Sequence, residues 1–490
     1  MKRLRQILQL FAIMLFVSAL FSCGKFSQTK HDINPADYNS AVALADAIKQ
    51  GKITSSELLE YYLQRISQYN GEINAVVAMD IEGARARAAE ADEALAKGEI
   101  WGPLHGLPMT VKDVFEVAGM PATSGDPGLK AYMPKRNAIV VQRLINAGAI
   151  VFGKTNTPFY AADSQTFNKV YGTTNNPWDL TRTPGGSSGG SAAALVMNFT
   201  SIELGSDIGG SLRNPAHYTG VYGHKPTFGV VPRLGHIPPP PGMIPPHIVP
   251  MIPLFVVGPM ARTAQDLELA MEVLAASGES AEESYRPKLL PLPKKTWQDY
   301  RVAVWLTDHY SDAEIDTEVL AVLRKTVNKL RKAGVRVDET ARPGVELKES
   351  RQLFLDIYNV MRKGPLPGEL VERQKKMQAT WAKFFESYDV LLTPVVPTVA
   401  FPHDQTQPKK SRALMINNKP RRYMSIHTWT LMAVVSGLPA TAAPAGLSES
   451  GLPVGIQIIG AGLEDRKTIA FAKGLSTLVG GFVAPPAYQE

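Results

Sequence analysis

The chain carries, at residues 184–226, the stretch PGGSSGGSAAALVMNFTSIELGSDIGGSLRNPAHYTGVYGHKP. Two short glycine runs in it bracket serines, one at residues 185–190 and one at residues 209–211, and no histidine or cysteine lies between them. Glycine at this density costs backbone entropy on folding, so it is expected where backbone must approach another group closely or adopt a positive φ. The stretch therefore predicts a site built from serine hydroxyls and uncovered backbone.

A serine hydroxyl is a weak nucleophile until a base removes its proton. Upstream, the run LPMTVKD at residues 107–113 places Lys112 at the end of a short apolar, strand-like segment. A lysine is neutral near pH 7 only where burial or its neighbours disfavour the ammonium. The apolar residues before Lys112 are consistent with such burial, so this lysine is the candidate base.

Several motifs, in this order along the chain, resemble the amidase signature family of Ser-Ser-Lys hydrolases. The resemblance covers roughly residues 38–485, and an ordered series of motifs is more specific than any one of them. The principal matches are VKD at 111–113, GGSSGGSAAA at 185–194 and DIGGSLRNPA at 207–216. Further matches lie at 154–158, 171–177, 223–227 and 258–263.

The resemblance implies a role for each of three side chains. By position, Lys112 is the base, Ser187 is a bridging serine in a cis peptide, and Ser211 is the nucleophile. The 24-residue separation of the two serines matches the family pattern, so the bridge is Ser187 and Ser188 is a supporting neighbour. The resemblance implies acylation of Ser211 followed by attack of water, with no metal or organic cofactor.

The turn before Ser211 is expected to stabilise the oxyanion of a tetrahedral intermediate. Successive backbone N–H groups of Ile208, Gly209 and Gly210 suit this role, and losing one such donor typically costs about 3–4 kcal/mol of transition-state stabilisation. A bulky side chain at either glycine should therefore impair turnover more than folding. Asp207 and Arg213 flank the turn, and we interpret them as an ion pair that braces it.

Other interpretations of these residues carry less weight. Residues 185–189 also satisfy G-x-S-x-G, but an α/β-hydrolase elbow needs an apolar strand before it, and residues 179–184 are polar and end in proline. A phosphate loop would need a Walker A lysine. Glycine-serine runs are often linkers, and a lone strand-end lysine is usually solvated. His217 and His224 are interpreted as structural, and we find no zinc-type ligand spacing.

The N-terminus has the layout of an export signal. A basic start at residues 2–5 precedes an apolar run at 10–17, which is shorter than the roughly 20 residues of a membrane-spanning helix. Cys23 is the only cysteine, and the preceding Leu20, Phe21 and Ser22 resemble a bacterial lipobox, although Phe21 is larger than the usual residue. We expect a signal peptide at 1–22, a lipidated tether at 23–37 and a catalytic domain at 38–490. The alternative is an ordinary signal peptide and a soluble periplasmic enzyme.

The charge excludes one class of partner. The formal net charge of +7 falls to +4 when residues 1–22, with Lys2, Arg3 and Arg5, are removed. No basic stripe with interleaved aromatic residues follows, so a nucleic-acid partner is not expected.

Helical and strand-like periods alternate along the chain, which favours an α/β architecture. We predict a single domain with a mixed central sheet covered by helices on both faces. Helices are expected at 41–49, 55–68, 82–97, 138–146, 188–197, 263–275, 314–333 and 466–478. Strands are expected at 107–112, 149–153, 301–306, 335–337 and 388–394. The proline-rich run at 236–247 predicts a loop, either a rim of the substrate entrance or a cover for the sheet.

These observations together predict an amidohydrolase that cleaves carboxylic amides of small molecules. Two alternatives remain open. One is a protein like the A subunit of an amidotransferase, which acts on glutamine and charged transfer RNA in the cytoplasm beside partner subunits. The other is an inactive, surface-binding lipoprotein.

Overall fold

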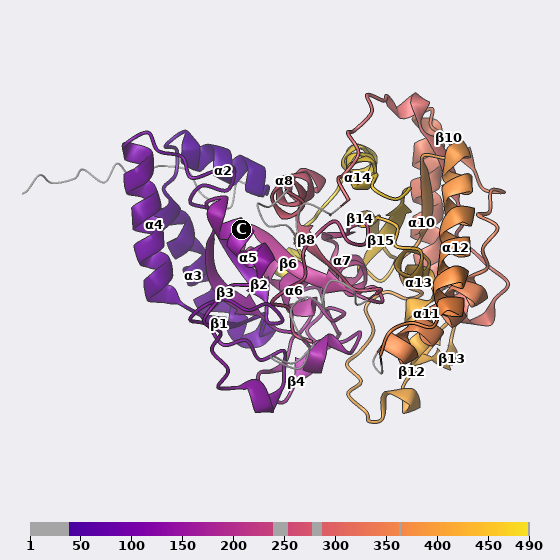
Figure 1. Cartoon of the computed structure of the whole chain (residues 1–490), viewed down its shortest axis with the longest axis horizontal. Coiled ribbons are helices and arrows are strands. Elements are labelled where there is room, and N and C mark those ends of the chain that lie inside the picture. Colours follow the sequence, from indigo (N-terminus) through magenta and orange to yellow (C-terminus); the bar gives the residue numbers. More distant parts are fainter. Residues whose placement is uncertain (1–38, 239–252, 277–286, 362–363, 489–490) are drawn as a thin grey trace, which may run out of the picture. The chain divides into compact units, whose positions relative to one another are not determined.

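The computed structural model describes residues 39–238, 253–276, 287–361 and 364–488. Residues Pro35–Glu490 form one compact unit built around an eleven-stranded sheet (Figure 1). The expected signal peptide, its tether and most of the proline-rich run lie outside the described residues. Within the described ranges, no helix is long and apolar enough to cross a membrane.

The strand order in the sheet is β1-β3-β2-β6-β8-β7-β14-β15-β11-β9-β10. Two separate hairpins, β4–β5 and β12–β13, lie outside it. The strands of the sheet are β1 (Val76–Met79), β2 (Pro108–Lys112), β3 (Ile150–Thr155), β6 (Ile202–Asp207), β7 (Tyr222–Lys225), β8 (Val256–Ala261), β9 (Arg301–Val304), β10 (Arg336–Asp338), β11 (Val390–Pro394), β14 (Ala440–Leu447) and β15 (Pro453–Ile459). The hairpin strands are β4 (Phe167–Asn168), β5 (Gly172–Thr173), β12 (Ala413–Ile416) and β13 (Lys419–Arg422).

The sheet is mixed, as the sequence predicts. Strand β2 runs parallel to both β3 and β6, and β9 runs parallel to β10 and β11, whereas the remaining neighbours are antiparallel. Because β2 and β6 are parallel neighbours, their carboxyl ends meet at one edge of the sheet. In open α/β sheets, ligands bind outside such ends.

Helices occupy every segment where the sequence predicts one, within a few residues at most ends. They are α2 (Ala41–Lys49), α3 (Ser55–Ile73), α4 (Ile81–Ala96), α5 (Ile139–Asn146), α6 (Gly189–Val196), α7 (Arg213–Thr219), α8 (Ala264–Leu274), α10 (Thr317–Lys332), α11 (Leu347–Met361), α12 (Gly368–Ser387), α13 (Thr428–Val435) and α14 (Asp465–Val479). Helix α3 begins with a capping box: the Thr54 side chain accepts the N–H of Glu57, whose carboxylate accepts the N–H of Thr54.

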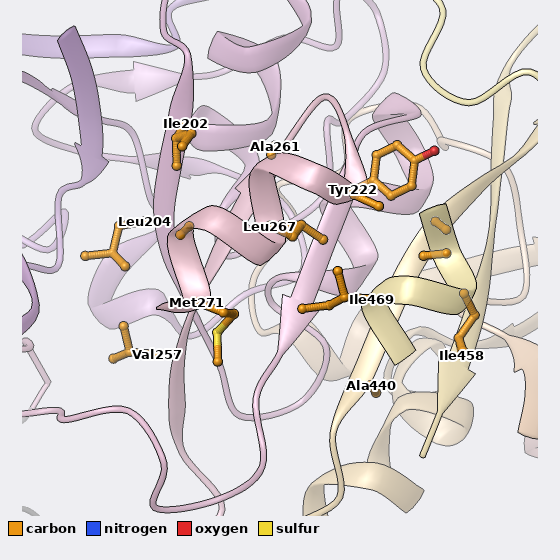
Figure 2. Close-up of a cluster of buried hydrophobic side chains, with 14 of the residues drawn as sticks. Ile202, Leu204, Tyr222, Val257, Ala261, Leu267, Met271, Ala440, Ile458 and Ile469 are labelled. Atoms are coloured by element: carbon orange, nitrogen blue, oxygen red, sulfur yellow. The ribbon is translucent and has the colours of Figure 1, made fainter. Parts of the chain in front are cut away.

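Helices cover both faces of the sheet. Met260 and Ala261 are adjacent in β8 and therefore point to opposite faces. Ala261 belongs to the main apolar core, with Leu267 and Met271 of α8 and residues of α14 (Figure 2). Met260 belongs instead to a second cluster that holds Leu195 of α6 and Ala216 of α7. The helices that follow the two glycine runs thus lie on the face away from α8 and α14.

Candidate active site

The candidate base, Lys112, lies beside a serine at the edge of the sheet where β2 and β6 end. Lys112 is the last residue of β2, and its side chain is fully buried. Its Nζ lies 2.6 Å from Ser187 Oγ and 3.2 Å from Ser206 Oγ, where Ser206 is the penultimate residue of β6. The structure therefore places Lys112 in direct contact with the serine that the family pattern makes the bridge.

The two glycine runs lie against each other. The N–H of Ser188 donates to the carbonyl of Ser211 at 3.2 Å, and the peptide bond between Gly186 and Ser187 is cis. Helix α6 begins directly afterwards, with Ser188 at its N-cap. A Cβ added at Gly190 would lie 2.4 Å from the backbone nitrogen of Asn156, so only glycine lets this helix start so close to the end of β3.

The three candidate catalytic side chains differ in their access to solvent. Lys112 and Ser187 are 0% exposed, whereas Ser211, directly before α7, is 8% exposed. Of the three, Ser211 is therefore the residue that has some surface open to solvent.

The surroundings of Lys112 favour its neutral form. Burial lowers the pKa of Lys112 to about 7, although the carboxyls of Asp207 and Glu203 act in the opposite direction. Burial also raises the pKa of Glu203 to about 8, which weakens the opposing effect of this carboxyl on Lys112 at neutral pH. The N-terminus of α6 adds the positive end of a helix dipole beside the site, which further disfavours an ammonium.

Asp207 and Arg213 form a fully buried ion pair, with Nη2 and Oδ1 2.8 Å apart. Arg213 also donates to the carbonyl of Thr430 at 2.8 Å and to Gln457 Oε1 at 2.5 Å. Burial alone would raise the pKa of Asp207, but the guanidinium of Arg213 holds it below its usual value. The pair thus ties the turn before Ser211 to β15 and α13.

The turn offers a different set of free backbone N–H groups from the one that the sequence suggests. The N–H of Gly210, which the sequence included among the donors, already donates to Asp207 Oδ1 at 2.8 Å. Within the described ranges, the N–H groups of Ile208, Gly209 and Ser211 have no hydrogen-bond acceptor. These three remain available to a ligand.

Substitution at the two glycines is also expected to differ in effect. Gly210 has a φ of +120°, and a Cβ there would lie 2.3 Å from Asn214 Oδ1. A side chain at this position therefore disturbs the fold itself, contrary to the sequence-based expectation. At Gly209 the closest atom to an added Cβ is His427 Nδ1 at 3.5 Å, which is an ordinary contact.

Some groups of the site were missed from the sequence. The carbonyl of Gly209 accepts from His427 Nδ1 and Thr430 Oγ1, both at 2.7 Å, which fixes the orientation of the turn. Ser206, the second partner of Lys112, was also missed, although its place directly before Asp207 in the motif was a usable signal. His427 carried no local signal because it is 218 residues from Gly209.

His217 and His224, which we interpret as structural residues, form hydrogen bonds with distant parts of the chain. His217 contacts the backbone of Gly455 and Thr398, and His224 contacts Thr441 and Asp465. In the part of the chain that the structure describes, no group of three or more His, Cys, Asp or Glu side chains is placed to hold a metal ion.

A cavity of about 490 Å³ lies between α12 and the end of α13, and its lining includes none of the three candidate catalytic residues.

Comparison with known proteins places the chain in a family. The family model described as Amidase matches residues 57–363 and 361–469. The chain belongs to the amidase signature family. It is accordingly an enzyme that acts on carbon–nitrogen amide bonds, which leaves the alternative of an inactive binding lipoprotein without support.

Two curated relatives are the A subunits of glutamyl-tRNA(Gln) amidotransferases. The relative from Chloroflexus aggregans (strain MD-66 / DSM 9485) is 33% identical over 86% of this chain and 93% of its own length. The relative from Anaeromyxobacter sp. (strain K) is 32% identical over 89% and 95%. Among solved structures, an amidase is 27% identical with a TM-score of 0.73, covering 90% of this chain and 100% of its own.

Proposed function

We propose that this enzyme hydrolyses carboxylic amides through an acyl-enzyme formed on Ser211. The observation that carries the proposal is the contact of 2.6 Å between Lys112 Nζ and Ser187 Oγ in a site where burial lowers the lysine pKa to about 7. A neutral amine touching a buried hydroxyl is suited to general-base catalysis at physiological pH.

In the proposed acylation step, Lys112 takes the proton of Ser187 as Ser187 takes that of Ser211. Ser211 Oγ then bonds to the carbonyl carbon, and the N–H groups of Ile208, Gly209 and Ser211 stabilise the oxyanion. The proton returns through Ser187 to the amine as the carbon–nitrogen bond breaks. Water repeats the sequence on the ester and releases the carboxylic acid.

The proposal is tested with the purified full chain and a panel of aliphatic, aryl, fatty-acyl and peptide-like amides. Release of free amine is measured for the wild type and for Ser211→Ala. We expect release from at least one class and none above background for the variant, because its nucleophile is missing. Equal release by both proteins would contradict the proposal.

A second candidate is an amidotransferase component that releases ammonia from glutamine and passes it to a charged transfer RNA. The names of the curated relatives favour this candidate over simple hydrolysis. Both candidates share cleavage of an amide by Ser211, and they differ in where the nitrogen goes. Co-purification of the chain from its host with partner subunits, and glutamine-dependent amidation of charged transfer RNA by the complex, would establish the second candidate over the first.

We also propose that the chain is exported and lipid-anchored through Cys23, with residues 1–22 as signal peptide, residues 23–37 as tether and residues 38–490 as the catalytic domain. The basic start, the short apolar run and the single cysteine support this. Labelling of cells with a fatty-acid analogue should mark the wild type and leave Cys23→Ala unmarked. Recovery of unlabelled wild type from the cytoplasmic fraction would contradict export and favour the amidotransferase.

A further inference from the structure

A histidine stands behind the lysine and contacts neither serine of the proposed relay. His236 Nε2 lies 2.9 Å from Ser206 Oγ, and Ser206 Oγ in turn lies 3.2 Å from Lys112 Nζ. The backbone around His236 is fixed on both sides, because Glu116 N–H donates to Gly235 at 2.9 Å and Ile237 N–H donates to Val114 at 2.7 Å. The imidazole is therefore held at a defined distance from the lysine.

The partners of the ring determine where its proton lies. His236 Nδ1 is 3.0 Å from the carbonyl of Pro238, a group that can only accept, so Nδ1 carries the hydrogen. Burial lowers the pKa of His236 to about 3, so the ring is neutral and Nε2 is an acceptor. The hydroxyl of Ser206 must then donate to Nε2, and its oxygen is left to accept from Lys112.

This arrangement decides what the lysine can do with its own lone pair. A neutral amine has two N–H donors and one lone pair. With the Ser206 hydroxyl turned towards His236, Lys112 can only donate to Ser206, and its lone pair is left for the hydroxyl of Ser187. Without an acceptor at Nε2, the Ser206 hydroxyl could rotate and donate to the lysine, in competition with Ser187.

We propose that His236 is a positioning residue that orients the Ser206 hydroxyl and thereby reserves the lone pair of Lys112 for Ser187. The proposal rests on the proposed function of the Lys112–Ser187–Ser211 relay. His236 acts only through Ser206 and does not touch the reacting atoms.

Among the residues that the structure describes, the remaining neighbours of the ring do not offer Nε2 another partner. Phe115 and Phe255 pack against the imidazole with ring centroids 5.3 and 4.3 Å away. The titratable or charged groups that face it are Lys112 from β2 and Arg233 from its own loop, and a positive charge on either one lowers the pKa of the ring further. Arg233 donates to the carbonyl of Phe255 at 2.8 Å.

The test measures the rate at which a fluorophosphonate modifies Ser211 in the full chain, from pH 5.5 to 9.5. In this reaction Ser211 Oγ bonds to phosphorus, fluoride leaves and the serine proton passes towards Lys112. We expect His236→Leu to lower the high-pH plateau about tenfold, the effect of one misdirected hydrogen bond. His236→Gln should stay within about threefold of wild type, because its side-chain oxygen reaches the place of Nε2 and can accept from Ser206.

The double-variant comparison isolates the route through Ser206. In a Ser206→Ala background there is no hydroxyl to orient, so adding His236→Leu should change the rate less than about twofold. An equal loss in both backgrounds, or a wild-type rate for His236→Leu alone, would overturn the proposal. His105→Leu, which also removes a fully buried imidazole but outside the site, serves as the matched control.

Two further arms keep the outcome interpretable. If His236→Leu does not fold, His236→Asn is compared with His236→Gln, because asparagine is too short to reach Ser206 and only glutamine should support labelling. If the wild type is not labelled, or is labelled at a residue other than Ser211, the proposed function fails. Labelling of Ser211 at equal rates in the asparagine and glutamine variants contradicts the role of His236 alone.

Discussion

Two buried lysines on neighbouring parallel strands have opposite surroundings. Lys112 ends β2, and Lys154 is the penultimate residue of β3; both side chains are fully buried. Lys154 Nζ contacts Asp113 Oδ1 at 3.2 Å and the carbonyls of Phe115 and Pro121 at 2.7 and 3.1 Å. Lys112 instead contacts the hydroxyls of Ser187 and Ser206.

The difference lies in what the partners can donate. Carbonyls and carboxylates only accept, so Lys154 is surrounded by three oxygens that match the three donors of an ammonium. Hydroxyls can also donate, so they are compatible with a neutral amine that accepts a proton. Burial alone does not make a lysine a base, and the chemistry of its partners decides between a structural cation and a catalyst.

The largest effects are expected when the amine of Lys112 or of Lys154 is removed, and the two variants should differ in which property they lose. Lys112→Met should lower the rate of Ser211 labelling by about 10³-fold, within the range of general-base catalysis, while the free energy of unfolding stays level or rises. Lys154→Met should lower the free energy of unfolding by about 3–5 kcal/mol, because it leaves Asp113 buried and unpaired. Labelling rates and urea denaturation of both variants check this. A folded Lys112→Met protein with wild-type labelling would contradict it.

The pH dependence follows from the form of Lys112 that reacts. The neutral amine is the active form, so the labelling rate should rise about tenfold per pH unit below pH 7 and level off above it. A stopped-flow or gel-based rate profile measures this directly. A rate that is flat from pH 5.5 to 9, or that falls with increasing pH, would show that this lysine is not the base.

The structural role of Lys154 can be examined with a second change beside it. Asp113→Asn in the Lys154→Met background removes the unpaired charge and should recover about 2 kcal/mol of the lost unfolding free energy. Urea denaturation compares the double variant with Lys154→Met. No recovery would mean that Lys154 stabilises the fold by packing and not by pairing with Asp113.

A third buried lysine, Lys225, tests whether a lowered pKa alone makes a lysine a catalytic base. Burial also lowers the pKa of Lys225 to about 7, but its Nζ donates to the carbonyl of Pro226 at 3.0 Å, a group with no proton to give. Lys225→Met should therefore leave the labelling rate within about threefold of wild type, as expected for a lysine that takes no part in proton transfer. A loss comparable to that of Lys112→Met would erase the distinction between them.

Much of the fold could be predicted because its helices are amphipathic. Helix α10, for example, alternates buried valines and leucines with exposed charged residues, so its period is visible. Helix α13 (Thr428–Val435) was missed because all its residues are buried and leave no period to detect. The β12–β13 hairpin was missed because both strands are only four residues long and β13 is polar, and the hairpin pairs outside the main sheet.

Only part of the candidate active site could be predicted from the sequence. The resemblance singled out Lys112, Ser187 and Ser211, and the parallel pairing of β2 with β6 explains how Lys112 comes close to Ser206, directly before the second glycine run. His236 and His427 could not be found in this way, since their contacts depend on how distant segments fold together. The hydrogen bond from the Gly210 N–H to Asp207 could not be predicted either, because the spacing of residues in a sequence does not show which N–H groups already have an acceptor.

The central claim is that a neutral Lys112 drives attack by Ser211. The most direct measurement is mass-spectrometric identification of the residue modified when the full chain reacts with a fluorophosphonate at pH 8, in the wild type and in Lys112→Met. We predict an adduct on Ser211 in the wild type and almost none in the variant. An adduct on Ser187, or undiminished modification of Ser211 without the lysine, would contradict the account.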